Sequence, residues 1–399
     1  MEAYIFDWIS LFFRWFHVIA GIAWIGASFY FVWLDNSLQT PPQWKQDKGI
    51  KGDLWAIHGG GFYEVAKYRL GPEQMPETLH WFKWESYVTW LTGMALLIIV
   101  YYSQAHSFML GSHTWIDNPQ LSVVAGMVFL AVAVSVYEII FRSPALNNMA
   151  MFTVLMIMLL VLLSWFAFHL FSPRAAFIQV GAAIGSIMVG NVFFGIIPAQ
   201  TAFVAAVKNG QQPDAVVSQK AGLRSRVNNY FTLPVIFIMI SNHYPFVYSN
   251  ELGWVWLILI SVLTAYARHY FNLKHQGVFR PGILVTAIIG LVVLAIAMMP
   301  DTLRNPQAAI KPVNDAMAMS LIHHRCTVCH SQNPVQPGFN APPAGLKLET
   351  MEQMINARDR VLQAVVYTHY MPLGNVTQMT LDERKTLASW LQSKIDQKK

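Results

Sequence analysis

Charged residues and cysteines are both scarce in this sequence. Only 12% of its 399 residues are charged and 55% are hydrophobic, whereas a soluble domain carries roughly 25% charged residues. The scarcity is uneven, because 19 of the 48 charged residues lie between Asp301 and Lys399. The first 300 residues lack the charges that a water-soluble surface requires, so we expect them to lie in a lipid bilayer. The last hundred have the composition of a small soluble domain.

Several familiar motifs are also missing. Two cysteines are too few for a disulfide framework. The glycines at Gly59–Gly61 are not followed by Gly-Lys-Ser/Thr, so they do not form a phosphate-binding loop, and we expect a tight turn or a close backbone approach there. There is no dinucleotide fingerprint, no Ser-His-Asp set and no metalloprotease helix motif. The net charge of +6 does not indicate nucleic acid, because its basic residues follow membrane topology.

Apolar runs near the length of a bilayer crossing recur along the first 300 residues. They predict an all-α fold: a polytopic membrane helix bundle of about eight spans, followed by the small soluble domain. The sixth span is the weakest, because Asn242, His243 and Pro245 interrupt it. The expected spans are Trp8–Leu34, Tyr87–Ser103, Leu121–Phe141, Ala150–Phe171, Ala176–Pro198, Phe231–Tyr248, Leu252–Tyr270 and Pro281–Met299.

Basic residues in the connections predict the orientation of these spans. Alternate connections hold 14 lysines and arginines, whereas the N-terminal segment and the other connections hold only Arg174. Basic residues collect on the cytoplasmic side of membrane proteins. The asymmetry therefore predicts that both the N-terminus and the C-terminus lie outside.

Both cysteines lie in one motif, Cys326-Thr-Val-Cys329-His330. Cys-x-x-Cys-His is the attachment signature of a c-type haem. Two thiols one helical turn apart add to the two vinyl groups, and His330 presents its imidazole to the iron. The alternatives are a redox dithiol and half of a zinc site. No second cysteine pair supports zinc, and no thioredoxin-like strand pattern surrounds the motif.

The residues around the motif strengthen the haem prediction. Met371, in a Met-Pro pair about forty residues later, is the expected sixth ligand of the iron. His369 competes with it, and a methionine in the core is the plain alternative. Pro342 or Pro343 is expected to supply the carbonyl that orients His330. We expect helices at Asp315–Arg325 and Leu381–Ile395, the second opened by a capping box at Thr380–Glu383 and packed through Leu387, Trp390 and Leu391.

This stretch resembles a class I cytochrome c over roughly residues 313–396. We therefore divide the chain into a membrane domain at 1–300, a linker at 301–313 and a cytochrome c domain at 314–399. The resemblance implies haem attachment on the periplasmic side of a bacterial inner membrane. The loop charges place the C-terminus on that side independently.

Ionisable residues inside the spans are the second group of candidates, because they are costly there and usually functional. Arg14 and His17 lie on one face of the first span, in its outer half. His169 and His243 lie at comparable depth in other spans. Three histidines at one level are candidates to ligate a b-type haem between helices. The alternative is that each hydrogen-bonds a neighbouring helix or the headgroups.

The inner side carries Glu138, His80, Lys83, Glu85 and His269. Lys83 and Glu85 are expected at the interface, where a solvated or snorkelling side chain is the default. Asn191 lies deeper, and the plain expectation for it is an interhelical hydrogen bond.

Two N-terminal stretches carry a family resemblance: the run from Arg14 through His17 and Trp24 to Gly26, and the stretch Leu79–Tyr87. Together with the C-terminal cytochrome, they resemble the bacterial membrane-bound urate oxidases (urate hydroxylases) over essentially the whole chain. The first span also resembles, more loosely, membrane oxidases such as the oxygen-independent protoporphyrinogen oxidase.

The resemblance implies a purine-catabolic enzyme that oxidises urate to 5-hydroxyisourate with oxygen from water and makes no hydrogen peroxide. The electrons would pass through the c haem to a soluble periplasmic cytochrome c or a terminal oxidase. Urate is a planar monoanion, so its site should offer a cation, amide partners and an aromatic surface. Arg14 with Trp15 or Trp24 would serve an outer site, and Lys83 with His80 and Trp81 an inner one; Arg14, His80, Lys83 and Glu85 are the catalytic candidates.

The sequence is also compatible with two other functions. The chain is alternatively a non-enzymatic membrane cytochrome subunit that relays electrons for another dehydrogenase, or a protoporphyrinogen-type oxidase. Reduction of the haem by urate, in the purified chain alone, would separate these readings.

Overall fold

The computed structural model describes residues 2–111, 113–250, 252–299, 313–337, 339 and 341–396. It is mostly helical, at 71% of residues, and divides into two compact units. Unit 1 comprises Met1–Ala95, Ile184–Pro234 and Leu263–Ile288, and unit 2 comprises Leu96–Ala183, Val235–Val262 and Ile289–Lys399. The predicted linker at 301–313 lies outside the described residues except at Val313.

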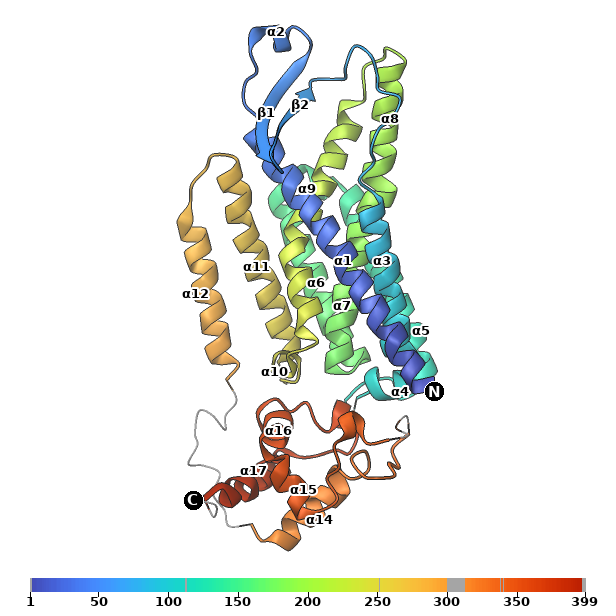
Figure 1. Ribbon diagram of the computed structural model, residues 1–399, viewed down its shortest axis with the longest axis vertical. Coiled ribbons are helices and arrows are strands. Elements are labelled where there is room, and N and C mark those ends of the chain that lie inside the picture. The colour runs from blue at the N-terminus through green and yellow to red at the C-terminus, as the bar shows by residue number, and fades with distance from the viewer. Residues whose placement is uncertain are drawn as a thin grey trace. The chain divides into compact units, whose positions relative to one another are not determined.

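Figure 1 shows the elements of the N-terminal 300 residues. They are α1 (Glu2–Ser37), α2 (Gln43–Gln46), β1 (Ile50–His58), β2 (Gly61–Tyr68), α3 (Trp84–Leu96), the π-helical turn η1 (Leu97–Tyr102), α4 (Ala105–Phe108), α5 (Pro119–Arg142), η2 (Pro144–Asn147), α6 (Met149–Leu170), α7 (Pro173–Gly190), the π-helical turn η3 (Asn191–Ile196), α8 (Ile197–Lys208), α9 (Ala215–Ser241), α10 (Pro245–Tyr248), α11 (Gly253–His275) and α12 (Pro281–Ala297).

Six helices among the described residues are long and apolar enough to cross a membrane. They are Tyr4–Ser37, Trp84–Tyr102, Pro119–Arg142, Met149–Leu170, Pro173–Lys208 and Gly253–His275. The prediction of eight spans differs at two places. The helix around the sixth begins at Ala215 and includes Arg224 and Arg226, and α12 has 17 residues. A membrane helix bundle is compatible with these helices.

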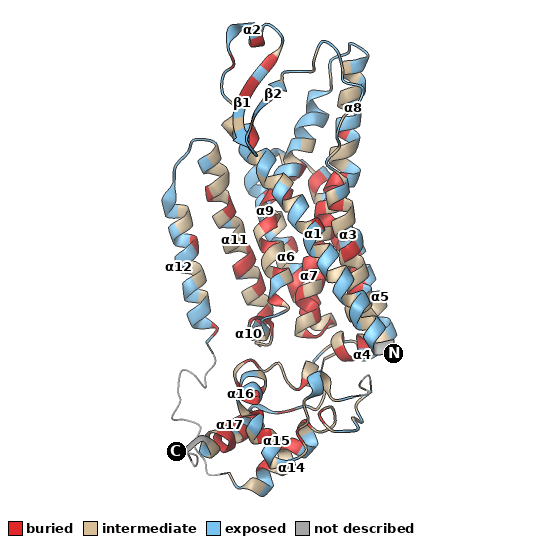
Figure 2. Ribbon diagram, in the orientation of Figure 1, coloured by how far each residue is buried: buried red, intermediate tan, exposed pale blue. Residues whose placement is uncertain are grey.

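Exposed apolar side chains mark the surfaces that would face lipid. In the most apolar window of α1 only 11% of residues are buried, whereas 56% are buried in the helix Pro173–Lys208. Ile22 on α1 is 67% exposed and Ile139 on α5 is 68% exposed. Figure 2 shows the same contrast between α1 and the largely buried α7. Apolar side chains so exposed would be unfavourable in water.

Asparagine side chains begin α5 and α6. Asn118 Oδ1 accepts from the amide of Leu121 at 2.9 Å, and Pro119 follows in the first helical position. Asn148 Oδ1 accepts from Ala150 and Met151 at 3.0 and 3.2 Å. Each side chain satisfies amides that no helical carbonyl can reach.

The predicted all-α class does not account for the antiparallel hairpin of β1 and β2. The glycines form its tight turn, as expected, because Gly59 and Gly60 have φ of 58° and 81° and a two-residue hairpin turn requires positive φ at both central residues. Trp55 and Phe62 on the strands are 62% and 80% exposed. One face of β1 is buried or half-buried, but its opposite face carries the exposed apolar residues Trp55 and Ile57, so the sequence lacks the polar–apolar alternation that reveals a strand.

The C-terminal region contains α14 (Asp315–Arg325), η5 (Pro343–Gly345), α15 (Met351–Asn356), α16 (Arg358–Val361), the π-helical turn η6 (Leu362–Tyr367), η7 (Leu373–Asn375) and α17 (Leu381–Asp396). Its core is built from its own residues, with Ile322 of α14 packed in one cluster with Leu387, Trp390 and Leu391 of α17. The capping box is present, because Thr380 N donates to Glu383 Oε2 at 2.7 Å and Glu383 N donates to Thr380 Oγ1 at 3.2 Å.

Candidate functional site

The Cys-x-x-Cys-His segment forms a tight turn directly after α14. The amides of Cys329 and His330 donate to the carbonyl of Cys326 at 3.2 and 2.9 Å. Cys326 and His330 are 8% and 9% exposed, and burial raises the pKa of the Cys326 thiol to about 12. The turn brings two thiols and an imidazole together at the edge of the C-terminal core.

His330 is held by a different carbonyl from the one predicted. Its Nδ1 lies 2.9 Å from the carbonyl oxygen of Leu346, so the expectation of Pro342 or Pro343 is wrong. Those two carbonyls accept from the amides of Gly345 and Leu346 inside the turn η5. With Nδ1 donating to Leu346, Nε2 carries the lone pair that an iron ligand requires.

Met371 is partly buried and packs against the C-terminal core. Arg384 fixes its loop, donating to the carbonyl oxygens of Val365 at 2.5 Å and Met371 at 2.6 Å. Burial lowers the pKa of Arg384 to about 10. The competitor His369 has a left-handed φ of 51°, and burial followed by the nearby Arg384 lowers its pKa to about 4.

His17 lies on α1 in unit 1 and contacts α3. Its Nδ1 is 3.0 Å from both the Thr89 carbonyl oxygen and the Thr92 hydroxyl. Gly93 makes this approach feasible, because a Cβ there would lie 3.0 Å from the imidazole Cε1. The backbone contact again assigns the proton to Nδ1 and leaves Nε2 as an acceptor.

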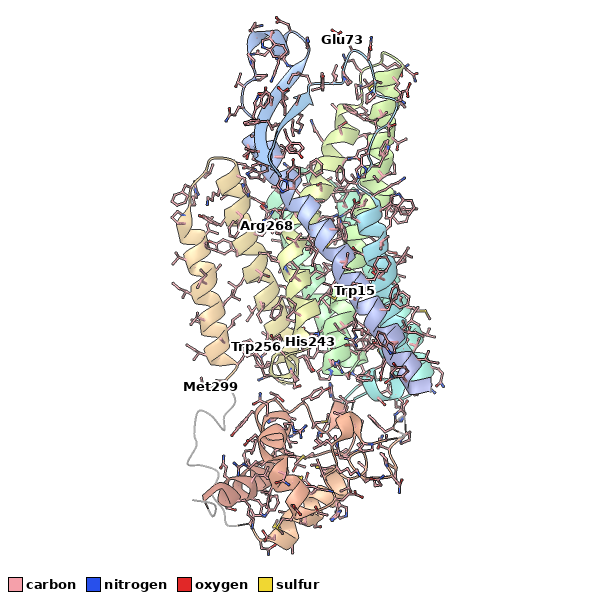
Figure 3. All side chains as sticks on the ribbon, in the orientation of Figure 1. Trp15, Glu73, His243, Trp256, Arg268 and Met299 are labelled. Atoms are coloured by element: carbon pink, nitrogen blue, oxygen red, sulfur yellow. The ribbon has the colours of Figure 1, made fainter. Side chains whose placement is uncertain are left out.

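His169 and His243 both belong to unit 2. His169 Nδ1 lies 2.8 Å from the Trp165 carbonyl oxygen, and its ring lies 4.7 Å from that of Trp115. His243 is exposed in the turn after α9 rather than inside a span (Figure 3). Within the described residues, no three or more His, Cys, Asp and Glu side chains are grouped as a metal site would need.

The four catalytic candidates lie in unit 1. Arg14 donates from Nε to Ser10 Oγ at 3.2 Å, one turn earlier on α1. His80 is exposed, with its ring 4.5 Å from Phe82. Lys83 lies 5.7 Å from the ring centroid of Trp84, and Glu85 is half-buried on α3.

Unit 1 also contains a buried polar network that sequence reasoning saw only in part. Asn191 Nδ2 donates to Asn228 Oδ1 at 2.8 Å, which confirms the expected interhelical hydrogen bond. Arg224 Nη1 donates to Asn191 Oδ1 at 2.7 Å. Gly195 leaves room for this arginine, since a Cβ there would lie 2.2 Å from Arg224 Cδ.

A second buried arginine of unit 1, Arg268 on α11, is labelled in Figure 3. Its Nε donates to Asn229 Oδ1 at 3.0 Å, and its guanidinium lies 4.0 Å from the ring centroid of Phe29. The next residue, His269, has Nδ1 at 2.7 Å from the Tyr230 hydroxyl.

Unit 2 contains a cavity of about 640 Å³, within the range of roughly 300–1,000 Å³ typical of small-molecule sites. None of its described lining residues is acidic. They are Ser107, Phe108, His113, Phe168, His169, Ser172, Pro173, Arg174, Tyr248, Ser249, Asn250, Trp254, His369, Tyr370, Leu373, Gly374, Asn375, Met379, Thr380, Leu381 and Arg384. The cavity thus joins residues of α4, α6, α7, α10 and α11 to the loop that carries Met371.

Arg174 at the start of α7 is the most distinctive residue of the cavity. Its Nε donates to Asn242 Oδ1 at 2.6 Å, and its guanidinium lies 5.0 Å from the Phe108 ring centroid. Nη1 is 3.5 Å from the Tyr370 hydroxyl. No carboxylate pairs with Arg174 among the residues that the structure describes.

Two further lining residues were not singled out from the sequence. Tyr248 is 2% exposed, and within the described structure its hydroxyl has no hydrogen-bond partner. Burial, and next the charge of His169, lowers the pKa of His113. None of Arg14, His80, Lys83 and Glu85 lines this cavity. The sequence offered one signal for this cavity: Arg174 is the one basic residue in the connections that are expected to lie outside.

Comparison with protein families gives a match across most of the chain. The urate oxidase N-terminal family matches residues 3–299. The chain belongs to this family. Membership in the urate oxidase N-terminal family places the chain, at a coarse level, among urate-related oxidoreductases. No curated protein and no solved structure matches the chain.

Proposed function

We propose that the chain is a membrane-bound oxidoreductase that converts urate to 5-hydroxyisourate and passes the electrons to a c-type haem on its own C-terminal region. The carrying observation is the presence, in one chain, of the urate oxidase N-terminal family and a buried Cys-x-x-Cys-His turn. The electrons then leave to a soluble periplasmic cytochrome c or a terminal oxidase, so no hydrogen peroxide forms.

The C-terminal residues fit such a haem. Cys326 and Cys329 would hold it covalently, His330 would ligate the iron through Nε2, and Met371 would be the sixth ligand. Two hydrogen bonds support these roles: His330 Nδ1 donates to the Leu346 carbonyl oxygen, and Arg384 Nη1 donates to the Met371 carbonyl oxygen. The haem supplies a one-electron acceptor.

The overall reaction balances without oxygen gas. Urate and one water give 5-hydroxyisourate, two protons and two electrons. Because one haem accepts one electron, oxidation requires two single-electron steps or a second centre in the membrane part.

A b-type haem is the second centre we propose. His17 is its best-supported ligand, because the Thr89 carbonyl orients the imidazole and leaves Nε2 as an acceptor. His169 has the same arrangement with the Trp165 carbonyl, whereas the exposed His243 has the weakest support.

The proposed location is a bacterial inner membrane with both termini in the periplasm. The 14 basic residues in alternate connections support this orientation. A reporter enzyme active only in the periplasm, fused after Lys399, should be active. An inactive fusion beside an active cytoplasmic reporter would reverse the orientation.

The decisive experiment uses the purified full-length chain. The pyridine haemochrome assay should give one haem c per chain, which remains attached after denaturation, together with non-covalent haem b. Addition of urate without any partner protein should reduce the haem c and yield 5-hydroxyisourate. Reduction of the haem by a non-specific reductant but not by urate would instead support a non-enzymatic electron-relay subunit. Reduction by protoporphyrinogen would support a protoporphyrinogen-type oxidase.

A His17→Ala variant tests the b haem separately. Loss of the non-covalent haem, with covalent haem c retained, is the expected result. A preparation of the wild-type chain that contains haem c alone would refute the b haem and leave the urate reaction standing.

A further inference from the structure

The cavity of unit 2 is an unusual environment for cations. It is lined by Arg174, Arg384 and three histidines, and its described lining has no carboxylate. A positive charge partly removed from water requires a compensating anion. Because the described chain supplies none at this place, the missing partner is expected to be a ligand.

We propose that this cavity is the urate-binding site, with the Arg174 guanidinium as the charge partner and the Tyr248 hydroxyl as a hydrogen-bond partner of the anion. This inference rests on the proposed function and adds to it the place and the residues of substrate binding.

Arg174 has donors left for a ligand. A guanidinium carries five N–H groups, and Asn242 Oδ1 takes the one on Nε. Tyr101 is a further hydrogen-bond partner of the guanidinium, and Nη1 lies 3.5 Å from the Tyr370 hydroxyl, the limit of a hydrogen bond. A flat anion with adjacent oxygen and nitrogen atoms matches the remaining donors in a bidentate manner.

Arg384 differs from Arg174 in this respect. Its Nη1 donates to the carbonyl oxygens of Val365 and Met371, and Nη2 lies 3.5 Å from Asn375 Oδ1. Its role is to hold the Met371 loop, and its charge adds to the field inside the cavity.

Tyr248 provides an independent observation. Its side chain is buried, lines the cavity, and has a hydroxyl without a hydrogen-bond partner in the described structure. Buried hydroxyls normally find a partner. A urate carbonyl oxygen or ring nitrogen would satisfy it.

The remaining lining suits a planar aromatic anion. Phe108, Phe168 and Trp254 provide apolar aromatic surface. The N-terminus of the 18-residue helix α7 also meets the cavity at Ser172, Pro173 and Arg174, and helix N-termini favour negative charge.

The position of the cavity also agrees with the proposed electron path. Its lining residues His369 and Tyr370 directly precede Met371, the proposed iron ligand. Urate oxidised here would release its two protons to water. Its two electrons would pass singly to the c-type haem that Cys326, Cys329, His330 and Met371 would hold, and from there to the soluble cytochrome acceptor.

The test measures binding and turnover separately on the full-length protein in detergent. Binding of labelled urate is measured by equilibrium dialysis on protein reduced beforehand, so that no turnover occurs. Turnover is the rate of haem reduction by urate. The variants are Arg174→Gln, Arg174→Lys and Tyr248→Phe. Arg142→Gln is the matched control, because Arg142 is an exposed arginine paired with Glu138. Arg268→Gln tests the buried arginine of unit 1 as a rival site.

We expect Arg174→Gln to raise the Kd for urate about 10- to 100-fold, as loss of a charge-assisted contact predicts. Arg174→Lys should recover part of this loss, and Tyr248→Phe should weaken binding about 3- to 10-fold. The neutral purine caffeine should bind equally to wild type and Arg174→Gln. Arg142→Gln should match wild type.

Unchanged urate affinity in both Arg174→Gln and Tyr248→Phe would overturn the inference, and weakened binding in Arg268→Gln alone would place the site in unit 1. If Arg174→Gln does not fold, Arg174→Lys and Tyr248→Phe decide. Failure of the proposed function looks different: urate would not reduce the wild-type haem, whatever the dialysis shows.

Discussion

Arginines of the two units share one kind of partner, an asparagine side-chain oxygen, and differ in what surrounds the rest of the guanidinium. In unit 1, Arg224 and Arg268 are 6% and 5% exposed and donate to side-chain amides of Asn191 and Asn229. In unit 2, Arg174 donates from Nε to Asn242 and turns the rest of its guanidinium toward a cavity. From this contrast we expect the unit 1 arginines to hold helices together, in line with the proposal that Arg174 binds a ligand.

The largest expected effect comes from removing an arginine of unit 1. Arg224→Ala removes the hydrogen bond from this buried cation to the Asn191 oxygen and leaves a cavity, so the protein should lose about 2–4 kcal/mol of stability. Thermal unfolding in detergent measures this loss. Arg226→Ala, which removes an exposed arginine two residues away, is the control. Equal unfolding temperatures for the two variants would contradict a structural role for Arg224.

Removing the Arg384 side chain should lower stability slightly less than removing that of Arg224. Arg384→Ala leaves the carbonyls of Val365 and Met371 without their donor, which should lower stability by about 1.5–3 kcal/mol. Thermal unfolding of the C-terminal region, followed by haem absorbance, reports it. Lys385→Ala, at an exposed neighbour, should behave as wild type; a loss as large there would assign the effect to α17 in general.

The space around Arg224 can be tested without touching the arginine. Gly195→Ala places a methyl group about 2.2 Å from Arg224 Cδ, and such overpacking should cost about 1–3 kcal/mol. Gly185→Ala is the matched change, since a Cβ there meets nothing within 4 Å. It should raise the unfolding temperature slightly because alanine favours a helix. A rise in both variants would show that the Arg224 side chain moves aside at no cost.

Arg174→Gln is expected to affect urate binding strongly and stability little. Its stability should change by less than about 1 kcal/mol, although urate binding is weakened, because its guanidinium is only half-buried and its hydrogen bonds all go to polar side chains that also line or border the cavity. Unfolding curves with and without urate measure both properties, and a given urate concentration should stabilise the wild type more than the variant. A large loss of stability in the ligand-free variant would make Arg174 a structural arginine like Arg224.

The smallest effect is expected at an exposed ion pair of unit 2. Hydrogen bonds from Lys394 and then from Trp390 lower the pKa of Asp315. The folded state therefore binds a proton less readily than the unfolded state, so the stabilisation is present above the unfolded pKa, near 4, and disappears as pH falls through the lower folded pKa. Asp315→Asn should be slightly less stable than wild type at pH 7 and equal to it near pH 2. A difference that persists at pH 2 would refute the linkage.

Periodic and local signals predicted much of the fold. The apolar runs located the six long helices, and the capping box at Thr380 and Glu383 located the start of α17. The expected helix Asp315–Arg325 matches α14. These features depend on neighbours in sequence. The hairpin was not predicted because apolar Trp55 and Ile57 occupy the exposed face of β1, which removes the polar–apolar alternation. The carbonyl at His330 was misassigned because Pro342 and Pro343 use theirs inside a turn.

The cavity was beyond sequence reasoning for another reason. Phe108, Arg174, Tyr248 and Tyr370 are far apart in the chain, and only the fold brings them together. A Cys-x-x-Cys-His motif can be recognised in a sequence because covalent haem attachment demands residues close together in the chain. A binding cavity has no such spacing rule, although Arg174 stood out as the lone exception to the charge asymmetry.

The hairpin of unit 1 has a consequence for local motion. Two strands alone are marginally stable in water. Here Lys45 of α2 is buried and bonded to Asp53 on β1 and Glu64 on β2. Because a single lysine joins both strands to the preceding turn, amide hydrogens of residues 50–68 should exchange with solvent in one cooperative opening, well before those of the helices. Lys45 therefore holds together a folding unit, made of α2, β1 and β2, that opens separately from the helices.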